Sequence, residues 1–267
     1  MPKRLGQHFL THHPTLFAIA DALEPTGEDA VIEVGPGHGE LTRALLEKVP
    51  KLHLLTIEKD ARLAKELRRI FPVSRFPNLV VREGDVRKEL PGVVARFSNK
   101  NGFKVIGNIP YYLTGYLFRL LGDLPKRPTR AVFTIQQEVA ERIVALPPRM
   151  NLLAATLQIW ATPKLILKIP ARYFSPQPNV NSAVIELNSK PGIPDDSFLK
   201  NYFLFVRNLF RQPRKTVLNN LVFAYPAKKT AVIKALAHLS VPANSRPQNL
   251  SVETIIALTK TLGCPQK

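Results

Sequence analysis

The fold is decided by residues 30–40, AVIEVGPGHGE. Residues 30–34 form a short, largely apolar run, which is typical of a buried parallel strand. Glycines follow at Gly35, Gly37 and Gly39, and apolar residues at helical spacing resume over 41–46. Glycines between a strand and a helix let a ligand approach the backbone closely. The stretch therefore predicts the first strand, loop and helix of a ligand-binding α/β domain.

The alternation of strands and helices continues along the chain. Further strands are expected at 52–57, 79–81, 103–107, 130–135 and 183–187, and further helices at 14–23, 63–70 and 116–121. Such alternation predicts a mostly parallel sheet covered on both faces. After residue 190 we expect helices only, at 198–210, 231–239 and 252–262. The prediction is an α/β domain over 1–190 and a small all-helical domain over 191–267.

Composition restricts the function. The 267 residues include 38 Lys and Arg against 20 Asp and Glu, a net charge of +18, and residues 191–267 alone carry 11 basic and 3 acidic residues. Such an excess indicates a polyanion partner, either nucleic acid or an anionic membrane surface. The single cysteine, Cys264, excludes a disulfide framework and a cysteine zinc site. No apolar run is long enough to span a bilayer. We therefore expect a cytoplasmic protein with no membrane partner. We also expect no metal.

Two carboxylates follow successive predicted strands. Glu58 lies 23 positions after Gly35, and Asp85 follows the next strand. A carboxylate at the position of Glu58 accepts hydrogen bonds from both hydroxyls of a ribose. Taken alone, the glycine motif could equally hold NAD, and a tight turn that binds nothing is a further alternative. The two carboxylates favour a nucleoside-containing cofactor, and the next strand decides between NAD and S-adenosylmethionine.

That next strand ends in GNIPYY, residues 107–112, which suits methylation of an exocyclic amine. The Asn108 side-chain oxygen and a backbone carbonyl beside Pro110 are expected to accept the two amino hydrogens of adenine. This frees the nitrogen lone pair for attack on a sulfonium methyl, with positioning and oriented dipoles supplying most of the acceleration. Pro110 fixes the chain, and Tyr111 offers a ring for base stacking. The alternative is an Asn-Pro turn without a role in chemistry.

With these motifs, the chain resembles the small-subunit rRNA adenine dimethyltransferases, the kasugamycin-resistance methyltransferase family. The resemblance covers nearly the whole length. The matching motifs are GQHFL at 6–10, EVGPG at 33–37, IE at 57–58, GD at 84–85, NIPY at 108–111, QEVA at 137–140, FSPxP at 174–178, SAV at 182–184, residues 210–216 and residues 246–251. It implies a Rossmann-like class I methyltransferase domain that uses S-adenosylmethionine. It also implies transfer of four methyl groups to two adjacent adenosines in a hairpin loop near the 3′ end of 16S rRNA. The expected substrate is an immature 30S subunit, and the expected enzyme is a monomer active in small-subunit ribosome biogenesis.

The resemblance also implies roles for individual residues. The expected S-adenosylmethionine contacts are His8, Leu10, Gly35, Glu58, Asp85 and Asn108. The expected catalytic residues are Asn108, Pro110, Tyr111 and Phe174, with Phe174 lining the base pocket opposite Tyr111. His8 stands where many members have Asn, and both types can bond a cofactor carboxylate. The sequence departs from the family at 146–151, LPPRMN, where a longer loop is usual, and at Pro213, which replaces a common basic residue and is expected to start a helix.

The basic residues of the tail are interpreted as an RNA surface. Those expected to contact phosphates are Lys200, Arg207, Arg211, Arg214 and Lys215. The alternative is a solvated face with no ligand. Two other functions remain open: a methyltransferase of large-subunit rRNA or DNA, and a non-catalytic assembly or transcription factor on the same fold. A NAD dehydrogenase is disfavoured, because nothing in the sequence resembles a hydride-transfer acid or base.

Overall fold

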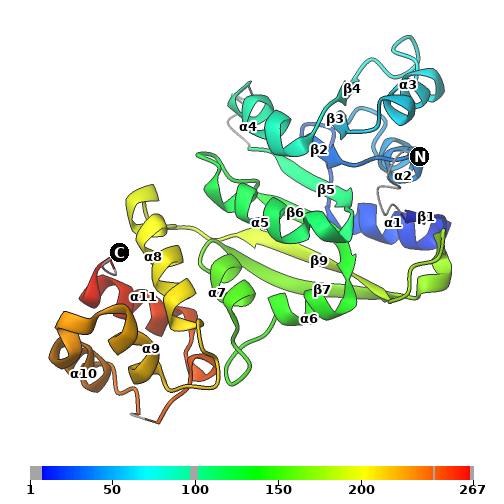
Figure 1. Ribbon diagram of the computed structural model, residues 1–267. Coiled ribbons are helices and arrows are strands. Elements are labelled where there is room, and N and C mark those ends of the chain that lie inside the picture. The colour runs from blue at the N-terminus through cyan, green and yellow to red at the C-terminus, as the bar shows by residue number, and fades with distance from the viewer. Residues whose placement is uncertain (1–7, 97–101, 243, 265–267) are drawn as a thin grey trace. The chain divides into compact units, whose positions relative to one another are not determined.

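The computed structural model describes residues 8–96, 102–242 and 244–264, so Gly6 and Gln7 of the first family motif lie outside the described residues. By its internal contacts the chain forms two compact units (Figure 1). The first unit comprises Met1–Ala140 and Thr162–Ser189, and the second unit comprises Glu141–Ala161 and Lys190–Lys267. The two units differ from the predicted division after residue 190 in the place of Glu141–Ala161 and, by one residue, in the place of Lys190.

The first unit is built on a hydrogen-bonded sheet of seven strands in the order β4-β3-β2-β5-β6-β9-β7. Its strands are β2 (Ala30–Val34), β3 (His53–Glu58), β4 (Leu79–Glu83), β5 (Lys104–Asn108), β6 (Arg130–Gln136), β7 (Ala161–Ile169) and β9 (Ser182–Ser189). The first five strands in this order, β4, β3, β2, β5 and β6, pair in parallel, whereas β9 is antiparallel to β6. The predicted mostly parallel sheet is confirmed, and β7 is a strand that the sequence pattern did not reveal.

Strands β2 and β5 lie side by side at the centre of the sheet, where the strand order reverses. The connections are α1 (His13–Ala22), α2 (Glu40–Lys48), α3 (Ala61–Ile70), α4 (Val86–Arg96), α5 (Thr114–Asp123) and α6 (Gln137–Ile143), with short 3₁₀ turns η1 (Tyr111–Leu113) and η2 (Ala171–Tyr173). In open α/β sheets, ligands bind at the carboxyl ends of the strands at this reversal. The fold thus places a binding site beyond Val34 and Asn108.

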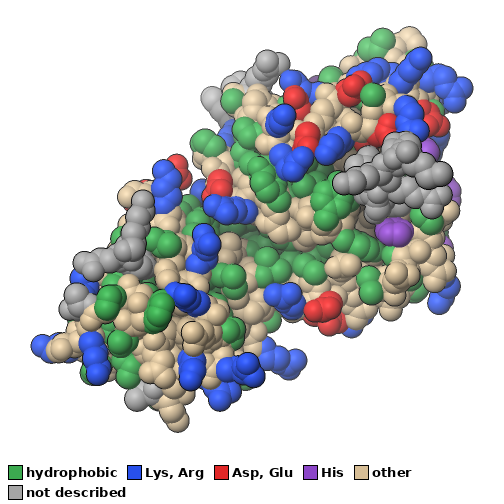
Figure 2. Space-filling model, viewed as in Figure 1, with side chains coloured by type: hydrophobic (Ala, Val, Ile, Leu, Met, Phe, Trp, Pro, Cys, Tyr) green, Lys and Arg blue, Asp and Glu red, His purple; other side chains and the backbone are tan. Residues whose placement is uncertain are grey.

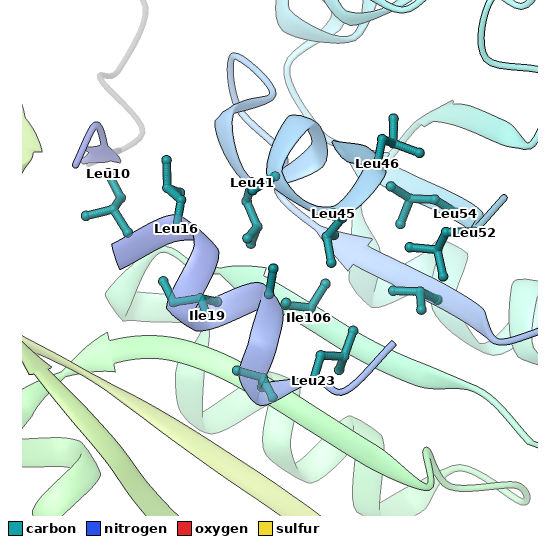
Figure 3. Close-up of a cluster of buried hydrophobic side chains, with 14 of the residues drawn as sticks. Leu10, Leu16, Ile19, Leu23, Leu41, Leu45, Leu46, Leu52, Leu54 and Ile106 are labelled. Atoms are coloured by element: carbon teal, nitrogen blue, oxygen red, sulfur yellow. The ribbon is translucent and has the colours of Figure 1, made fainter. Parts of the chain in front are cut away.

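Helices α1 and α2 bury a leucine-rich core against the sheet. Figure 3 shows Leu16, Ile19 and Leu23 of α1 and the turn after it meeting Leu41 and Leu45 of α2. Each of these side chains is at most 4% exposed. Burying one such side chain stabilises the fold by roughly 1.5–3 kcal/mol, so this cluster anchors the glycine loop that precedes α2.

A small antiparallel sheet pairs two distant segments of the first unit. Strand β1 (Phe9–Leu10) lies against β8 (Phe174–Ser175), with Leu10 opposite Phe174. Leu10 and Phe174 are buried and belong to the same core cluster as the α1 leucines. The pairing fixes residues 8–10 beside the carboxyl edge of the large sheet.

The second unit is helical in its described residues. It contains α7 (Leu152–Gln158), α8 (Asp196–Leu209), α9 (Val217–Ala224), α10 (Lys229–His238), α11 (Val252–Leu262) and the 3₁₀ turns η3 (Pro226–Lys228) and η4 (Pro247–Asn249). Residues 141–161 belong to this unit because α7 packs on α8, where Tyr202 Oη donates a hydrogen bond to Ala155 O at 3.0 Å. Among the residues that the structure describes, no helix is long and apolar enough to cross a membrane.

The expectation that Pro213 starts a helix is wrong. Pro213 lies in a turn, and α9 begins four residues later at Val217. The physical reason is the N-cap: Thr216 Oγ1 accepts a hydrogen bond from Asn219 N at 3.2 Å and satisfies a helix N–H that otherwise lacks a partner.

Candidate cofactor and adenine site

Two pockets of the first unit adjoin at the carboxyl edge of the sheet, and Gly35 and Pro110 line both. The other residues around the first pocket are His8, Phe9, Leu10, Leu16, Glu33, Pro36, Gly37, Glu40, Leu41, Asn108, Ile109, Tyr111 and Phe174. Those around the second pocket are Val34, Ile57, Glu58, Lys59, Gly84, Asp85, Val86, Arg87, Tyr112 and Leu113. The two pockets bring together all the expected cofactor and catalytic residues, although they are dispersed over residues 8–174.

The glycine loop has the backbone of a ligand cradle. Gly35 and Gly37 adopt φ values of +65° and +62°, a region that side-chain-bearing residues rarely occupy. An added Cβ at Gly37 would lie 2.7 Å from the Phe9 ring, so that glycine is required by packing. At Gly35 the nearest atom to an added Cβ is Asn108 O at 4.0 Å, so the Cβ would occupy open space beside both pockets. This bare backbone fits a cofactor that passes from one pocket to the other.

Glu58, at the end of β3, holds the loop as well as lining the second pocket. Its Oε2 accepts a hydrogen bond from Gly37 N at 3.2 Å, and its Oε1 accepts one from Asp60 N at 2.8 Å. The residue is 2% exposed, and burial raises the pKa of its carboxyl against the opposing effect of these backbone donors. Two of its acceptor positions are thus engaged, and those that remain suit a diol.

Asp85 is held by two cations at the rim of the second pocket. Arg87 donates to both carboxylate oxygens, through its Nε to Oδ1 at 2.9 Å and through its Nη2 to Oδ2. Lys59 Nζ lies 3.2 Å from Oδ2, and Arg87 N donates to Oδ1 at 3.0 Å. The Arg87 guanidinium holds the pKa of Asp85 well below its usual range, so the carboxylate is ionised. The sequence did not indicate either cation.

Asn108, at the end of β5, is oriented by a distant backbone group. Its Nδ2 donates a hydrogen bond to His8 O at 3.0 Å. The amide nitrogen therefore has its acceptor, and the side-chain oxygen is left to accept from a molecule in the first pocket. Pro110 follows two residues later, with φ of −56°, and begins the turn that carries Tyr111.

Tyr111 forms one wall of the first pocket. A 2.8 Å hydrogen bond joins its Oη to Ser182 Oγ, and its ring stacks on the His8 ring with centroids 5.8 Å apart. Burial raises the pKa of the Tyr111 hydroxyl, so it stays protonated at neutral pH. His8 is itself fixed, because its Nδ1 donates to Pro176 O at 2.7 Å. The two rings form a preorganised aromatic surface.

Leu10 and Phe174 line the same pocket but are mostly buried, at 2% and 5% exposure. The Leu10 side chain belongs to the core cluster, so its backbone is the part best suited to contact a ligand (Figure 3). Phe174 lies in β8, where its strand partner is Leu10. The pairing of β1 with β8 therefore holds both residues at the wall of the first pocket.

Glu33 is a pocket residue that the sequence interpretation missed. It lies in β2 and is 1% exposed, and Thr42 Oγ1 donates a 2.6 Å hydrogen bond to its Oε2. Its Oε1 is buried without a hydrogen-bond partner among the described residues. Burial raises the pKa of Glu33 to about 8. Its place as the one acidic residue in an apolar strand was the available signal. The described ranges 8–96, 102–242 and 244–264 hold no cluster of three or more His, Cys, Asp or Glu suited to a metal ion.

The basic residues singled out in the second unit are all exposed. Lys200 and Arg207 lie on α8, whereas Arg211, Arg214 and Lys215 follow its end. Figure 2 shows that the charged side chains on the visible face of this unit are mainly Lys and Arg. Their exposure is compatible with contact to a polyanion, and their contact with RNA stays a prediction.

The loop between α8 and α9 is ordered from within. Asn220, 5% exposed, accepts from Gln212 N at 3.0 Å and donates to Gln212 O at 3.0 Å and to Thr216 O at 3.1 Å. Arg211 lies over the ring of Phe223, with its Cζ 4.1 Å from the ring centroid, and that phenylalanine is 60% exposed. This exposed cation–aromatic pair was not anticipated from the sequence.

A parallel sheet in this order, with one antiparallel strand beside β6 and a glycine loop at the strand reversal, defines a Rossmann-like class I methyltransferase fold. Residues 1–262 match the family model described as ribosomal RNA adenine dimethylase. The chain belongs to that family, whose members are S-adenosylmethionine-dependent adenine dimethyltransferases.

Relatives support the same assignment. The chain is 35% identical over 274 residues to the ribosomal RNA small subunit methyltransferase A of Shouchella clausii, covering 98% of this chain and 90% of the relative. It is 35% identical over 266 residues to the protein of the same name from Acidobacterium capsulatum, covering 97% and 90%.

Solved structures share the fold. The 23S rRNA methyltransferase ErmE superposes with a TM-score of 0.73 at 26% identity, covering 95% of this chain and 99% of that one. A dimethyladenosine transferase from Plasmodium falciparum gives a TM-score of 0.78 at 24% identity, covering 95% and 96%.

Proposed function

We propose that this protein dimethylates the N6 amino groups of two adjacent adenosines in a hairpin loop near the 3′ end of 16S rRNA, within an immature 30S subunit. The observation that carries the proposal is the setting of Asn108. Its nitrogen is engaged by His8 O, and its oxygen is left to the pocket that Tyr111 lines. We further propose that the protein acts as a monomer in the cytoplasm.

In this proposal S-adenosylmethionine spans the two adjoining pockets. Glu58 would accept hydrogen bonds from the ribose hydroxyls, and Asp85 would bind the adenine part of the cofactor. The first pocket would hold the methionine part beside Gly35, with polar contacts from His8 and the Leu10 backbone, and would admit the target base beside Asn108 and Tyr111. The bare Gly35 backbone and the ionised Asp85 support this assignment. When bound, the cofactor supplies a methyl group on a positively charged sulfur.

The chain's own residues prepare the amine. Asn108 Oδ1 and a backbone carbonyl beside Pro110 accept the two amino hydrogens of the target adenine, which draws the nitrogen toward a tetrahedral shape. Tyr111 stacks on the base, and Phe174 lines the same pocket and excludes water. Because Asn108 and Tyr111 are already held by His8 O and Ser182, the donors and acceptors need little reorganisation when the base enters. The base reaches the pocket only after leaving its stack.

The second unit is proposed to dock on the ribosomal RNA through Lys200, Arg207, Arg211, Arg214 and Lys215. Replacing Arg207, Arg211 and Lys215 together by Gln should weaken 30S binding and flatten its salt dependence, by roughly one unit of slope per lost phosphate contact. Binding to 30S particles across a salt series measures both quantities. Identical affinities and slopes for wild type and variant would assign these charges to a solvated face.

The relatives at 35% identity are named as small-subunit rRNA methyltransferases, whereas ErmE, at 26% identity, is described as a 23S rRNA methyltransferase. The names of the more similar relatives therefore favour the small subunit. The direct test incubates the protein with unmethylated 30S and 50S particles and labelled S-adenosylmethionine and maps the product by mass spectrometry. We expect dimethyladenosine at two adjacent positions near the 3′ end of 16S rRNA. Methylation confined to 23S rRNA, or no methylation at all, would overturn the proposal.

A further inference from the structure

A third pocket of the first unit lies beside the proposed adenine site and contains none of the residues assigned to it. It is lined by Gln136, Gln137, Glu138, Asn179, Val180 and Asn181. The pocket forms where β6 ends and β9 begins, since Gln136 is the register partner of Ser182. Ser182 Oγ is in turn 2.8 Å from Tyr111 Oη. Asn181 of the third pocket is thus the sequence neighbour of Ser182, which contacts Tyr111 in the wall of the adenine site.

The backbone frame of this pocket is fixed. Gln137 N donates to Asn181 O at 3.0 Å, which ties the start of α6 to the segment before β9. Asn181 Oδ1 accepts from Ala171 N at 3.0 Å, which ties the same segment to η2. Glu138 and Asn179 are exposed, so their side chains are accessible from solvent. A rigid frame with accessible polar side chains suits recognition of a ligand.

The chemistry of the lining fits a nucleobase better than a phosphate. Amide side chains such as Asn179 carry a donor and an acceptor, which together match an edge of adenine. The Glu138 carboxylate accepts from an exocyclic amine and repels a phosphate. Val180, 45% exposed, adds an apolar contact for a ring face. Single-stranded RNA is read by such contacts to unstacked bases.

We propose that the third pocket binds the base of the adenosine adjacent to the one being methylated, through Asn179 and Glu138. This inference rests on the proposed function, in which two adjacent adenosines are modified. One base occupies the site of Asn108 and Tyr111 while its neighbour occupies the third pocket. The neighbour donates an amino hydrogen to Glu138 until its own N6 is dimethylated, so this contact assists methylation of the first of the two adenosines and is lost for the second.

The test is a cycle that combines one protein change with one RNA change. The protein variant is Glu138→Ala with Asn179→Ala, and the control is Gln177→Ala, an exposed amide on the same segment that does not line the pocket. The RNA change replaces one of the two adenosines by uridine in 16S rRNA reconstituted into 30S particles. The readout is kcat/KM for methylation of the remaining adenosine, with Tm measured for each protein to check folding.

In the wild type and the control, the uridine should lower kcat/KM roughly five- to a hundredfold, as expected for loss of a bidentate base contact. The double variant should show a similar loss on unchanged RNA and little further loss with uridine, because the two changes remove the same contact. An equal uridine penalty in wild type and double variant would overturn the proposal, as would wild-type activity of the variant on unchanged RNA. Absence of methylation by the wild type on unchanged 30S particles would instead contradict the proposed function itself.

Discussion

Replacing Glu33 by Gln tests how the buried carboxyl beside the first pocket affects stability. Glu33 is 1% exposed, and its Oε1 has no hydrogen-bond partner in the part of the chain that the structure describes. Burial disfavours the ionised form and raises the pKa of the folded protein's Glu33 from 4.5 to about 8. A glutamine at this position has the same shape, accepts the same hydrogen bond from Thr42 and carries no charge at any pH.

The magnitude follows from the two pKa values. Because the folded pKa is raised, the favourable contribution of the protonated carboxyl is fully present below pH 4.5 and is lost as pH rises toward about 8. Over that window the wild type loses about 1.4 kcal/mol of unfolding free energy per pH unit relative to the Gln variant. Between pH 5 and pH 7 the difference amounts to about 2–3 kcal/mol, or roughly 5–10 °C in Tm for a protein of this size.

The assay is thermal unfolding of both proteins at half-unit pH steps. The Tm of Glu33→Gln minus that of the wild type should rise from pH 5 to pH 8 and then level off. The variant Glu47→Gln, which changes an exposed carboxyl on α2, is the matched control and should show no such trend. A Tm difference that stays constant with pH would mean that Glu33 ionises equally in the folded and unfolded chains, and the reasoning from burial would be refuted.

Three further changes test the site and the basic loop. The variant Asn108→Ala should keep most of the affinity for S-adenosylmethionine. Its single-turnover methylation rate should fall by a factor of about 10²–10³, the usual effect of losing one preorganised dipole, and an unchanged rate would exclude the role of Asn108 in preparing the amine. Glu58→Gln should weaken cofactor binding about tenfold to a hundredfold in calorimetry, through loss of a charged acceptor worth roughly 1.5–3 kcal/mol, without altering 30S binding. Asn220→Ala should lower the unfolding free energy by about 1–3 kcal/mol and weaken 30S binding, because the Gln212 backbone loses its partners. Asn219→Ala, an exposed neighbour on the same helix, is its control, and equal behaviour of the two would contradict the role of Asn220 in ordering the loop.

The elements with strong local patterns were predicted well. The expected strand over 30–34 coincides with β2, and the expected helix over 198–210 ends one residue beyond α8. These elements carry their signal in consecutive apolar residues, which is independent of the rest of the chain. Strand β7 and helix α4 were missed because Pro163 and the pair Pro91–Gly92 indicate interruptions. Proline is tolerated in β7 because that strand is the last in the sheet order and lies at the edge of the sheet.

The residues of the candidate site likewise fall into those that the sequence predicted and those that only the structure reveals. The residue types at the strand ends, such as Glu58 and Asn108, could be predicted because each follows a recognisable strand. Their partners could not, because the contacts join residues far apart in sequence, as in the bond from Asn108 to His8. The engagement of Asp85 by Lys59 likewise depends on how neighbouring strand ends meet in space. Local patterns thus indicated residues that line the two pockets, whereas the electrostatics of those pockets require the three-dimensional structure.

The short pairing of β1 with β8 has a consequence for synthesis of the chain. Phe9 and Leu10 leave the ribosome well before their strand partners, Phe174 and Ser175, which lie more than 160 residues later in the chain. At about 5–20 residues per second, roughly 10–30 s separate their emergence. During that interval the glycine loop can form, but the wall that His8 and Phe174 give to the first pocket cannot. A nascent chain is therefore expected to acquire a complete methyl-transfer pocket only after most of its first unit has been translated.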